Sequence, residues 1–437
     1  MLVYSYLRSE VLFPEERQGN LSEIYFIYYL ISFVGIIFWG VIFRLRDEIK
    51  LNITMVTISL LVGLYLVEIT ISMYVPNTFE NQQELRALEM GVEYDSRTKS
   101  QIYYELNNKG MDVVLSIHPS DHFSESNGVP GIEPLFPLGG ISNKTTVYCN
   151  ESGKYMIFSS DRYGFNNPDW EHDTPAEWVL IGDSYVQGAC VGPGEDIAGQ
   201  IRKIFNLSIV NLGIGGNGPL TEFATLREYG GSIKPKVVIW GYVENDLMDN
   251  LSREKNSPLL MNYLNSEFDQ NLVHRQTEID DRLNKYIKVE ERRIRGVEKS
   301  LNILKKTTVL RLGNIRKLIG FNKAGLNKSS SINVDPLFKE ILVKSRDLVS
   351  SWGGQLYFVY FPSFPKSKSD WQNYHFNKHD EVIKVVKSIN LPIIDLSSEL
   401  FSKHPDPLSL LPLRGHGHYN AKGYSEVAKT IVSRVVK

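Results

Sequence analysis

The chain has few features that would tie it to nucleic acid or to a small disulfide-rich fold. Its 437 residues include only two cysteines, Cys149 and Cys190, and its formal net charge is −2. Two cysteines are too few for the disulfide framework of a small secreted domain, although they could form one bridge or stay as two buried thiols. The charge provides no overall basic field for nucleic acid, and no Cys/His spacing is typical of a zinc finger. Nucleic-acid partners are therefore not expected.

Charged residues are also nearly missing from two long runs close to the N-terminus. Residues 24–43 contain no charged side chain, and residues 51–75 contain only Glu68. At about 1.5 Å per helical residue, each run can cross a hydrocarbon core of about 30 Å. The first run is too long and too far from the start for a simple cleaved signal peptide, and a second run follows it. We therefore predict a membrane anchor in residues 1–80 that forms a two-helix transmembrane hairpin. Glu68 then either reaches the outer interface or pairs inside the bundle.

The orientation of this hairpin is predicted from the connection between the two runs. Residues 44–50 carry Arg44, Arg46 and Lys50, whereas the outer flanks are poorer in positive charge. Short loops that are rich in Lys and Arg are typical of the cytoplasmic side. We therefore expect the soluble part of the chain on the periplasmic side of a cytoplasmic (inner) membrane. An extracytoplasmic location would permit a bridge between the two cysteines.

The soluble part changes character at about residue 176. Residues 81–175 are rich in turn formers, and we interpret them as a neck and lead-in segment, with a strand pair predicted within 145–167. Beyond this point, continuous apolar strands alternate with helices, which is typical of a parallel sheet covered on both faces. The predicted strands are 177–181, 207–212, 236–242, 356–361 and 392–396, and the predicted helices are 219–229, 336–351, 379–389 and 421–436. We expect residues 176–437 to form a three-layer α/β/α fold on a parallel, flavodoxin-like sheet of about five strands.

A long insertion at about 250–335 separates the third and fourth predicted strands. Within it, residues 271–320 contain thirteen Lys or Arg against six Asp or Glu. Apolar residues recur at helical spacing, so a helical insertion is expected. Its basic face is either solvated, as on a cap over the domain, or lies on anionic lipid or an acidic polymer.

The ends of the predicted strands carry the residues that suggest chemistry. These residues, together with a histidine before the last helix, are Asp183, Ser184, Gly216, Asn245, Asp246 and His418. Carboxyl ends of parallel strands meet at one edge of a sheet, so we expect these groups to lie together. Acyl transfer needs a nucleophile, a base and donors for the oxyanion. Ser184 and His418 suit the first two roles, and the N–H groups of Ser184 and Gly216 with the Asn245 amide suit the third.

This set of residues resembles the SGNH hydrolase family, also called GDSL esterases. The four letters match Ser184 in GDS, Gly216 in NLGIGG, Asn245 in END and His418 in GHYNAKGY. The resemblance covers about 177–437 outside the insertion. It implies a three-layer α/β/α fold and ester hydrolysis or acyl transfer without a metal or an organic cofactor. One departure is Tyr185, which stands where the family usually has leucine.

A second departure concerns the acid that normally supports the histidine. The family usually has Asp three residues before it, where this chain has Gly415. Such an acid fixes the histidine tautomer and stabilises the imidazolium. Three interpretations follow: a backbone carbonyl orients His418, another carboxylate reaches it, or the protein is a weakened or non-catalytic relative. The candidate supporting residues are Asp183, Asp246, Asp406 and His416.

Two other motifs suggest different functions but fit the sequence less well than the serine hydrolase interpretation. Residues 213–218 fit G-x-G-x-x-G, which is typical of dinucleotide sites, but they follow the second strand and not the first. His404, His416 and His418 could bind a metal, but no further ligand at metal spacing adjoins them. We therefore predict a serine esterase or O-acyltransferase, without cofactor or metal, that acts on a carbohydrate or lipid ester of the cell envelope. The alternative is a non-catalytic module for polysaccharide binding or assembly.

Overall fold

The computed structural model describes residues 21–74, 79–123, 128–288, 312–313, 315, 334–362 and 379–436. The chain divides into two compact units. The first, which we call the anchor unit, comprises Met1–Asn77 and Gly296–Ile332. The second, the sheet unit, comprises Thr78–Arg295 and Asn333–Lys437.

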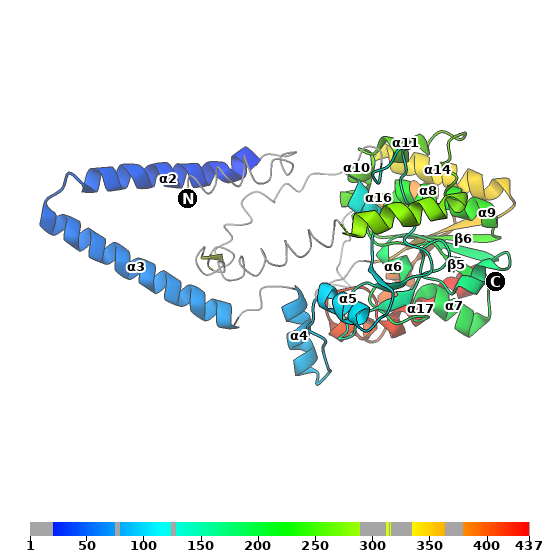
Figure 1. Cartoon of the computed structure of the whole chain (residues 1–437), viewed down its shortest axis with the longest axis horizontal. Helices are drawn as coiled ribbons and strands as arrows, with labels where there is room; N and C mark the ends of the chain where they lie inside the picture. The colour runs from blue at the N-terminus through cyan, green and yellow to red at the C-terminus, as the bar shows by residue number, and fades with distance from the viewer. Residues whose placement is uncertain are drawn as a thin grey trace. The chain divides into compact units, whose positions relative to one another are not determined.

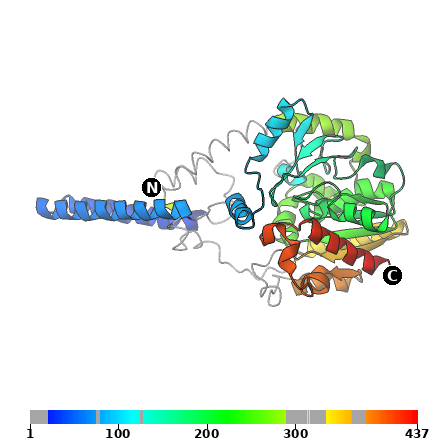
Figure 2. The same ribbon diagram turned by 90° about the horizontal axis from the view of Figure 1, so that it is seen from below.

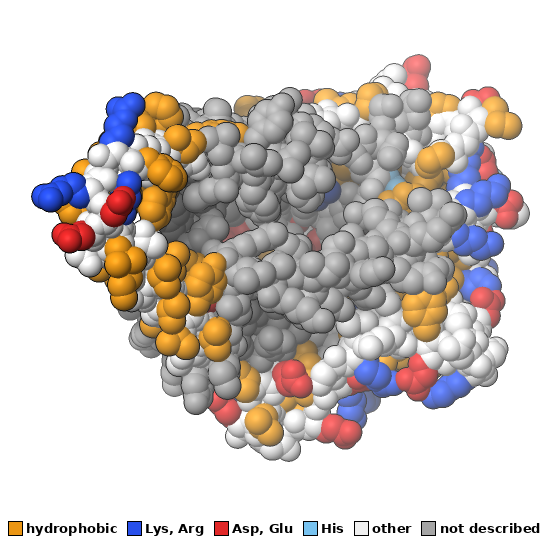
Figure 3. Space-filling model, turned by 60° about the vertical axis from the view of Figure 1, so that its left-hand side comes forward, with side chains coloured by type: hydrophobic (Ala, Val, Ile, Leu, Met, Phe, Trp, Pro, Cys, Tyr) orange, Lys and Arg blue, Asp and Glu red, His pale blue; other side chains and the backbone are white. Residues whose placement is uncertain are grey.

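The described part of the anchor unit contains two consecutive apolar helices, α2 (Leu21–Ile42) and α3 (Asp47–Tyr74) (Figure 1). Among the described residues, one helical stretch is long and apolar enough to cross a membrane, Asp47–Ile71, and α2 contributes the shorter apolar stretch Tyr29–Ile42. Most of their large hydrophobic side chains are exposed. Figure 3 shows many such side chains on the left-hand part of the surface, beside a group of charged ones. Exposed apolar surface of this extent is typical of a membrane contact.

Glu68 is the exception on the apolar surface of α3. Its side chain is buried, and its Oε2 accepts a hydrogen bond from the backbone N–H of Ile315 at 2.8 Å. The structure therefore gives this carboxylate a partner within the anchor unit and not an exposed position at an interface.

The sheet unit contains the predicted parallel sheet. Its five strands are β4 (Trp178–Ile181), β5 (Ile209–Asn211), β6 (Val237–Tyr242), β7 (Gln355–Tyr360) and β8 (Ile393–Asp395). They are ordered β5-β4-β6-β7-β8, and every neighbouring pair is parallel. This order confirms the predicted flavodoxin-like sheet. Because the order reverses beside β4, the carboxyl ends of β4 and β6 flank the crevice where such sheets bind ligands.

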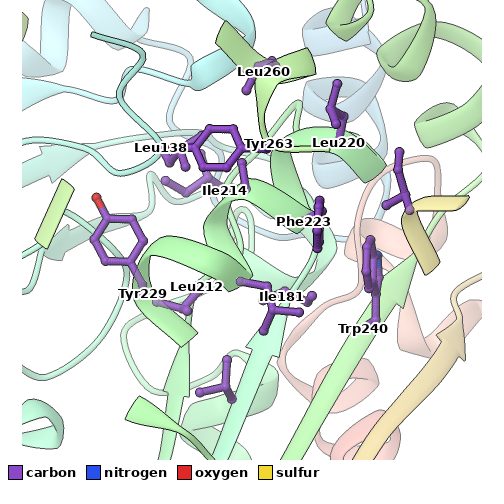
Figure 4. Packing of buried hydrophobic residues seen from close by; sticks show 14 of the residues in the cluster. Leu138, Ile181, Leu212, Ile214, Leu220, Phe223, Tyr229, Trp240, Leu260 and Tyr263 are labelled. Atoms are coloured by element: carbon purple, nitrogen blue, oxygen red, sulfur yellow. The ribbon is translucent and has the colours of Figure 1, made fainter. Parts of the chain in front are cut away.

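Both faces of the sheet are covered, as the continuous apolar strands require. Side chains alternate along each strand, so Val179 and Ile181 join one buried cluster while Trp178 and Leu180 join another. The first face is covered by α8 (Pro219–Thr225), α14 (Pro336–Ser351) and α16 (His379–Ser388), and the second by α7 (Ile197–Phe205) and α17 (Ala421–Val435). Figure 1 shows these layers, and Figure 4 shows Phe223 and Trp240 among the side chains that fill the first.

The lead-in segment is more structured than a neck of loops. It contains α4 (Phe79–Glu89), α5 (Lys99–Asn108), β1 (Val113–Leu115), β2 (Thr145–Val147) and β3 (Ile157–Ser159). β2 pairs with β1 in parallel and with β3 antiparallel, so the predicted strand pair is confirmed. The segment lies against the main sheet within one compact unit (Figure 1, Figure 2). Asn167 joins the two parts directly, because its amide exchanges hydrogen bonds of 2.8 Å with the backbone N–H and C=O of Asn211 at the edge of β5.

The described part of the insertion is helical. It contains α10 (Leu251–Glu254), α11 (Pro258–Asn262), η7 (Leu272–His274) and a helix at 276–288. Most of the basic residues predicted for it, from 289 to 311 and beyond 315, lie outside the described residues. The remaining short helical turns are η3 (Pro119–His122), η4 (Asp169–His172), α6 (Ser184–Gln187), η5 (Leu226–Gly230), α9 (Gly231–Ile233), η6 (Asp246–Asn250), η9 (Ser397–Phe401), η10 (Pro407–Leu410) and η11 (Pro412–Arg414).

Candidate active site

Ser184 is held at the sheet edge by the turn between β4 and α6. Asp183 caps α6, because its Oδ1 accepts the N–H of Tyr185 at 2.9 Å. Ser184 is therefore the first helical residue, where the backbone N–H has no partner inside the helix. Its side chain is partly exposed. The turn thus presents a hydroxyl together with a backbone N–H that has no acceptor among the described residues.

His418 approaches this hydroxyl from the C-terminal part of the chain. Its Nε2 lies 2.8 Å from Ser184 Oγ, so the structure brings the predicted nucleophile and base into proton-transfer distance. The position is fixed from behind, because Asn420 caps α17 by accepting the N–H of Gly423 at 2.9 Å. The Tyr185 ring packs against the imidazole with ring centres 4.7 Å apart. The unusual tyrosine after the serine thus contacts the base.

The other nitrogen of His418 is held by a residue that the sequence did not suggest. Glu151, in the loop between β2 and β3, places Oε1 2.9 Å from His418 Nδ1, and its Oε2 accepts the His418 backbone N–H at 2.7 Å. Glu151 is nearly buried. A carboxylate in this position selects the tautomer with the proton on Nδ1, which leaves Nε2 free to accept the serine proton. The three side chains therefore have the geometry of a Glu–His–Ser triad.

Nδ1 of His418 is not bound by the candidates that the sequence suggested. Asp406 does not take this place, because its two carboxylate oxygens bind the guanidinium of Arg414 at 2.8 and 2.9 Å. A backbone carbonyl does not take it either, since Glu151 occupies Nδ1. His416 is exposed, and its carbonyl accepts a hydrogen bond from Gln83 of α4. At Gly415, the family's usual position for the acid, an added Cβ would collide with the guanidinium of Arg86.

His418 and Glu151 each favour the charged form of the other. Burial lowers the pKa of His418, but the charge of Glu151, its hydrogen bond and the charge of Asp183 outweigh burial and raise that pKa above the ordinary value. Burial raises the pKa of Glu151, yet the neighbouring His418 more than compensates and lowers it. Glu151 is therefore ionised at neutral pH and can stabilise an imidazolium when His418 accepts a proton.

The acid is positioned by a disulfide and by a glycine. The Cys149–Cys190 bridge, which the sequence left open, joins the loop that carries Glu151 to the segment just after α6, with the two Cα atoms 5.1 Å apart. On the other side, Gly417 has a φ of +149°, and an added Cβ would lie 2.5 Å from Glu151 Oε2. Only glycine permits this close approach. The sequence contained one indirect hint at Glu151: it lies two residues after Cys149, one of the two cysteines that could form a bridge.

The residues predicted for the oxyanion follow the carboxyl ends of three neighbouring strands, Ser184 after β4, Gly216 after β5 and Asn245 after β6. Gly216 has a φ of +76°, and among the described residues no acceptor is found for the N–H of Gly216 or of Ser184. Burial raises the pKa of Asp183, and the neighbouring Asn245 side chain, whose amide nitrogen carries two N–H groups, is among the groups that act in the opposite direction. Asp246 supports the same turn, because its Oδ2 accepts the N–H of Val243 at 2.8 Å. Two backbone N–H groups and one side-chain amide are thus the candidate donors for an oxyanion.

The glycine-rich loop does not offer a phosphate cradle. The N–H groups of Gly213, Gly215 and Gly218 already donate to side chains of Asn211, Gln187 and Glu254, at 2.9, 2.8 and 2.7 Å. A dinucleotide site needs such N–H groups for the pyrophosphate. Dinucleotide binding at this loop is therefore not supported.

The structure does not bring His404, His416 and His418 together as metal ligands; the group of possible ligands that it does bring together among the described residues is a different one. Glu151, Cys190 and His418 place potential ligand atoms within 4.8 Å of one another. The sulfur of Cys190, however, is in the disulfide and offers no thiolate, and the other two groups bind each other. This donor set does not fit a metal ion.

The sheet is parallel and in flavodoxin-like order, with the serine after its first strand, the glycine after its second, the asparagine after its third and the histidine before the last helix. This is the order of blocks on which the sequence resemblance to SGNH hydrolases depends. No protein-family model and no curated protein matches the chain.

Solved structures to which the chain is similar include one lipase/acylhydrolase and two esterases. One is a lipase/acylhydrolase from Enterococcus faecalis, with 15% identity, a TM-score of 0.32 and coverage of 59% of this chain and 94% of that one. Another is a catalytic mutant of an acetylxylan esterase from Geobacillus stearothermophilus, with 13% identity, a TM-score of 0.31 and coverage of 60% and 94%. A two-domain esterase active on acetylated mannans has 14% identity, a TM-score of 0.31 and coverage of 61% and 51%. Likeness at this level carries no weight for function, which has to come from the site itself.

Proposed function

We propose that the sheet unit is a serine esterase or O-acyltransferase with Ser184 as nucleophile, His418 as general base and Glu151 as the acid of the triad. The observation that carries the proposal is the unbroken hydrogen-bonded chain from Glu151 through His418 to the partly exposed hydroxyl of Ser184. The N–H groups of Ser184 and Gly216, for which no acceptor is found in the part of the chain that the structure describes, are the proposed oxyanion donors.

The reaction follows from this geometry. Ser184 Oγ attacks the ester carbonyl carbon while its proton moves to His418 Nε2, and the N–H donors at Ser184, Gly216 and Asn245 bind the oxyanion. Collapse of this intermediate breaks the bond to the alcohol, which leaves with the proton from His418. The acyl-serine is then attacked by water or by a second hydroxyl, whose proton passes to His418. Serine regains its proton as the acid or the new ester departs, so the same residues serve hydrolysis and transfer.

The substrate is proposed to be a carbohydrate or lipid ester of the cell envelope. The apolar α3 is long enough for a membrane span, and the hairpin with α2 would keep the sheet unit beside the bilayer. The disulfide that holds Glu151 fits an oxidising, extracytoplasmic location, in agreement with the positive charges between the two helices. The non-catalytic alternative rested on a missing triad acid, and Glu151 removes that reason.

A fluorophosphonate probe tests the proposal on the full-length protein in detergent. We expect the probe to label the wild type and Ser184→Ala to abolish labelling. Ser402→Ala, which changes an exposed serine directly after η9, should leave labelling unchanged. Hydrolysis of 4-nitrophenyl acetate should follow the same pattern. A folded wild-type protein that neither reacts with the probe nor hydrolyses the ester would favour the binding module.

A further inference from the structure

Three polar side chains of the lead-in segment lie against the loop that carries the oxyanion glycine. We call His118, Ser120 and Tyr148 the polar rim. A Cβ added to Gly216 would lie 2.4 Å from Ser120 Oγ, and a Cβ added to Gly215 would lie 2.3 Å from the Tyr148 hydroxyl and 3.4 Å from His118 Nε2. The rim side chains therefore reach into the space that the two glycines leave free. All three are partly exposed, as are Gly216 and Ser184.

The rim is held in place by its neighbours. The backbone N–H of His118 donates to Asp121 Oδ2 at 2.9 Å, and the guanidinium of Arg253 donates to the carbonyl of Ser120 at 3.0 Å. The rings of His118 and Tyr148 meet edge to face, with centres 5.1 Å apart. The hydrogen bonds hold the backbone of His118 and Ser120, and the ring contact holds Tyr148, so the rim is preorganised for a ligand.

The rim is also uncharged at neutral pH. Burial and the nearby charge of Lys99 lower the pKa of His118 to about 4, although Asp121 acts in the opposite direction. Burial, together with the charges of Asp183 and Glu151, raises the pKa of Tyr148, so that its phenol stays protonated. Two hydroxyls and a neutral imidazole are therefore available, each able to donate or accept a hydrogen bond.

One atom of the rim lacks the partner that its burial demands. His118 Nε2 is inaccessible to solvent and has no hydrogen-bond partner among the described residues. Leaving a buried polar atom unpaired destabilises a fold, and such atoms are rare without a functional reason. Because Nε2 is closed to solvent, a ligand hydroxyl can pair with it only after the partly exposed His118 ring turns outward.

We propose that the polar rim binds the free hydroxyls of a saccharide and thereby orients an ester on the same sugar over Ser184. The rim offers neutral donors and acceptors beside aromatic ring edges, which match sugar hydroxyls, whereas an acyl chain would need an apolar wall. This inference rests on the proposed esterase function and narrows its substrate class to saccharide esters.

The test compares two substrates in the full-length protein. Tyr148→Phe, Ser120→Ala and His118→Phe each remove polar atoms of the rim and keep most of the shape. We expect each variant to raise KM about 3- to 10-fold for partially O-acetylated xylo-oligosaccharides, as the loss of one hydrogen bond predicts. KM and kcat for 4-nitrophenyl acetate, which has no sugar hydroxyls, should not change. Tyr357→Phe is the matched control, because it also removes one tyrosine hydroxyl. This hydroxyl lies near the start of β7 and hydrogen-bonds to Gln355.

Stability separates binding from a structural role. Because His118 Nε2 has no partner among the described residues, His118→Phe should leave Tm unchanged or raise it while saccharide KM rises. Equal losses on both substrates, or no loss on either, would overturn the proposal. Hydrolysis of 4-nitrophenyl acetate without hydrolysis of the saccharide ester would overturn the saccharide assignment and leave the esterase standing. If the wild type cleaves neither substrate, the proposed function fails. In that case, NMR titration with unacetylated xylo-oligosaccharide tests saccharide binding at the polar rim by itself. The rim proposal requires that the wild type binds this saccharide and that Tyr148→Phe weakens the binding.

Discussion

At the residue scale, the chemistry of His418 depends on a carboxylate that comes from another part of the chain. Glu151 and His418 are 267 positions apart, and Glu151 lies in the loop that connects β2 and β3 of the lead-in segment. Its two oxygens bind the side chain and the backbone of the same histidine. Such a contact fixes both the tautomer of the imidazole and its orientation toward Ser184.

Replacing Glu151 by glutamine should therefore slow catalysis and change its pH dependence. We expect kcat to fall about 10²- to 10⁴-fold, because an amide cannot stabilise the imidazolium; the equivalent loss in serine proteases is about 10⁴-fold. His418 accepts a proton only when it is neutral, so activity rises with pH through its pKa. Glu151 raises this pKa, so the acidic limb of kcat/KM should move to lower pH in the variant. Steady-state rates between about pH 4 and 9 measure both effects.

The control for this variant returns the acid to the position used by the family. Gly415→Asp, combined with Glu151→Ala and with Arg86→Ala to clear the space beside Gly415, should recover part of the lost rate. Unchanged kcat and an unchanged acidic limb in Glu151→Gln would contradict a triad role for Glu151.

The sequence was sufficient for some of these residues and not for others. Ser184, Gly216 and Asn245 were recognisable because each follows a strand end, and strand ends of a parallel sheet share one edge. Glu151 was not recognisable, because its contact depends on how a separate three-stranded sheet packs against the main one. Asp406 was a poor substitute, since the nearby Arg414 binds it.

At the element scale, the loop between β2 and β3 is the part that determines whether the triad is complete. This loop connects two strands of three residues each and is fastened to the segment after α6 by the Cys149–Cys190 bridge. Short strands alone give little resistance to movement. The disulfide is therefore expected to keep Glu151 beside His418.

Removing the bridge should cost both activity and stability. Closing a loop of 41 residues is worth about 4 kcal/mol of unfolding free energy in the chain-entropy model. We expect Cys149→Ser with Cys190→Ser, or treatment with a reductant, to lower Tm and to reduce kcat toward that of Glu151→Gln. The measurements are thermal unfolding and hydrolysis of 4-nitrophenyl acetate with and without dithiothreitol.

The double variant provides its own control, since dithiothreitol should not affect it further. Full activity of the reduced protein at a temperature well below its Tm would show that the bridge does not position the acid.

Elements with a clear apolar pattern were predicted well, and those without it were not. The five parallel strands are buried on both faces, and their apolar runs identified them. By contrast, α4 and α5 are polar for most of their length, and β1 exists only because Val113–Leu115 pairs with β2. Local sequence carries little information about a strand of three residues that is stabilised by its partner.

At the scale of the whole molecule, an apolar anchor unit and a sheet unit with a candidate active site share one chain. The helix Asp47–Ile71 meets the length and composition needed for a membrane span, and the shorter Tyr29–Ile42 stretch is apolar as well. We propose that both helices cross the bilayer as a hairpin. This arrangement would confine the active site to substrates close to the membrane surface.

The hairpin predicts a definite topology, which fusion reporters can measure. Arg44, Arg46 and Lys50 favour a cytoplasmic connection, so the sheet unit should lie outside. In a bacterial host, alkaline phosphatase fused after Lys437 should be active, because it folds only outside the cytoplasm, whereas a fusion after Arg46 should be inactive. The protein should also resist extraction by alkaline carbonate, since each apolar span buries about twenty residues in lipid. An active fusion at Arg46 with an inactive one at Lys437 would invert the topology. Activity at both positions would mean that the connection at residues 44–50 is outside the cytoplasm and that at most one helix crosses the membrane. The hairpin would then be wrong, and the disulfide would remain as the structural indication of an extracytoplasmic sheet unit.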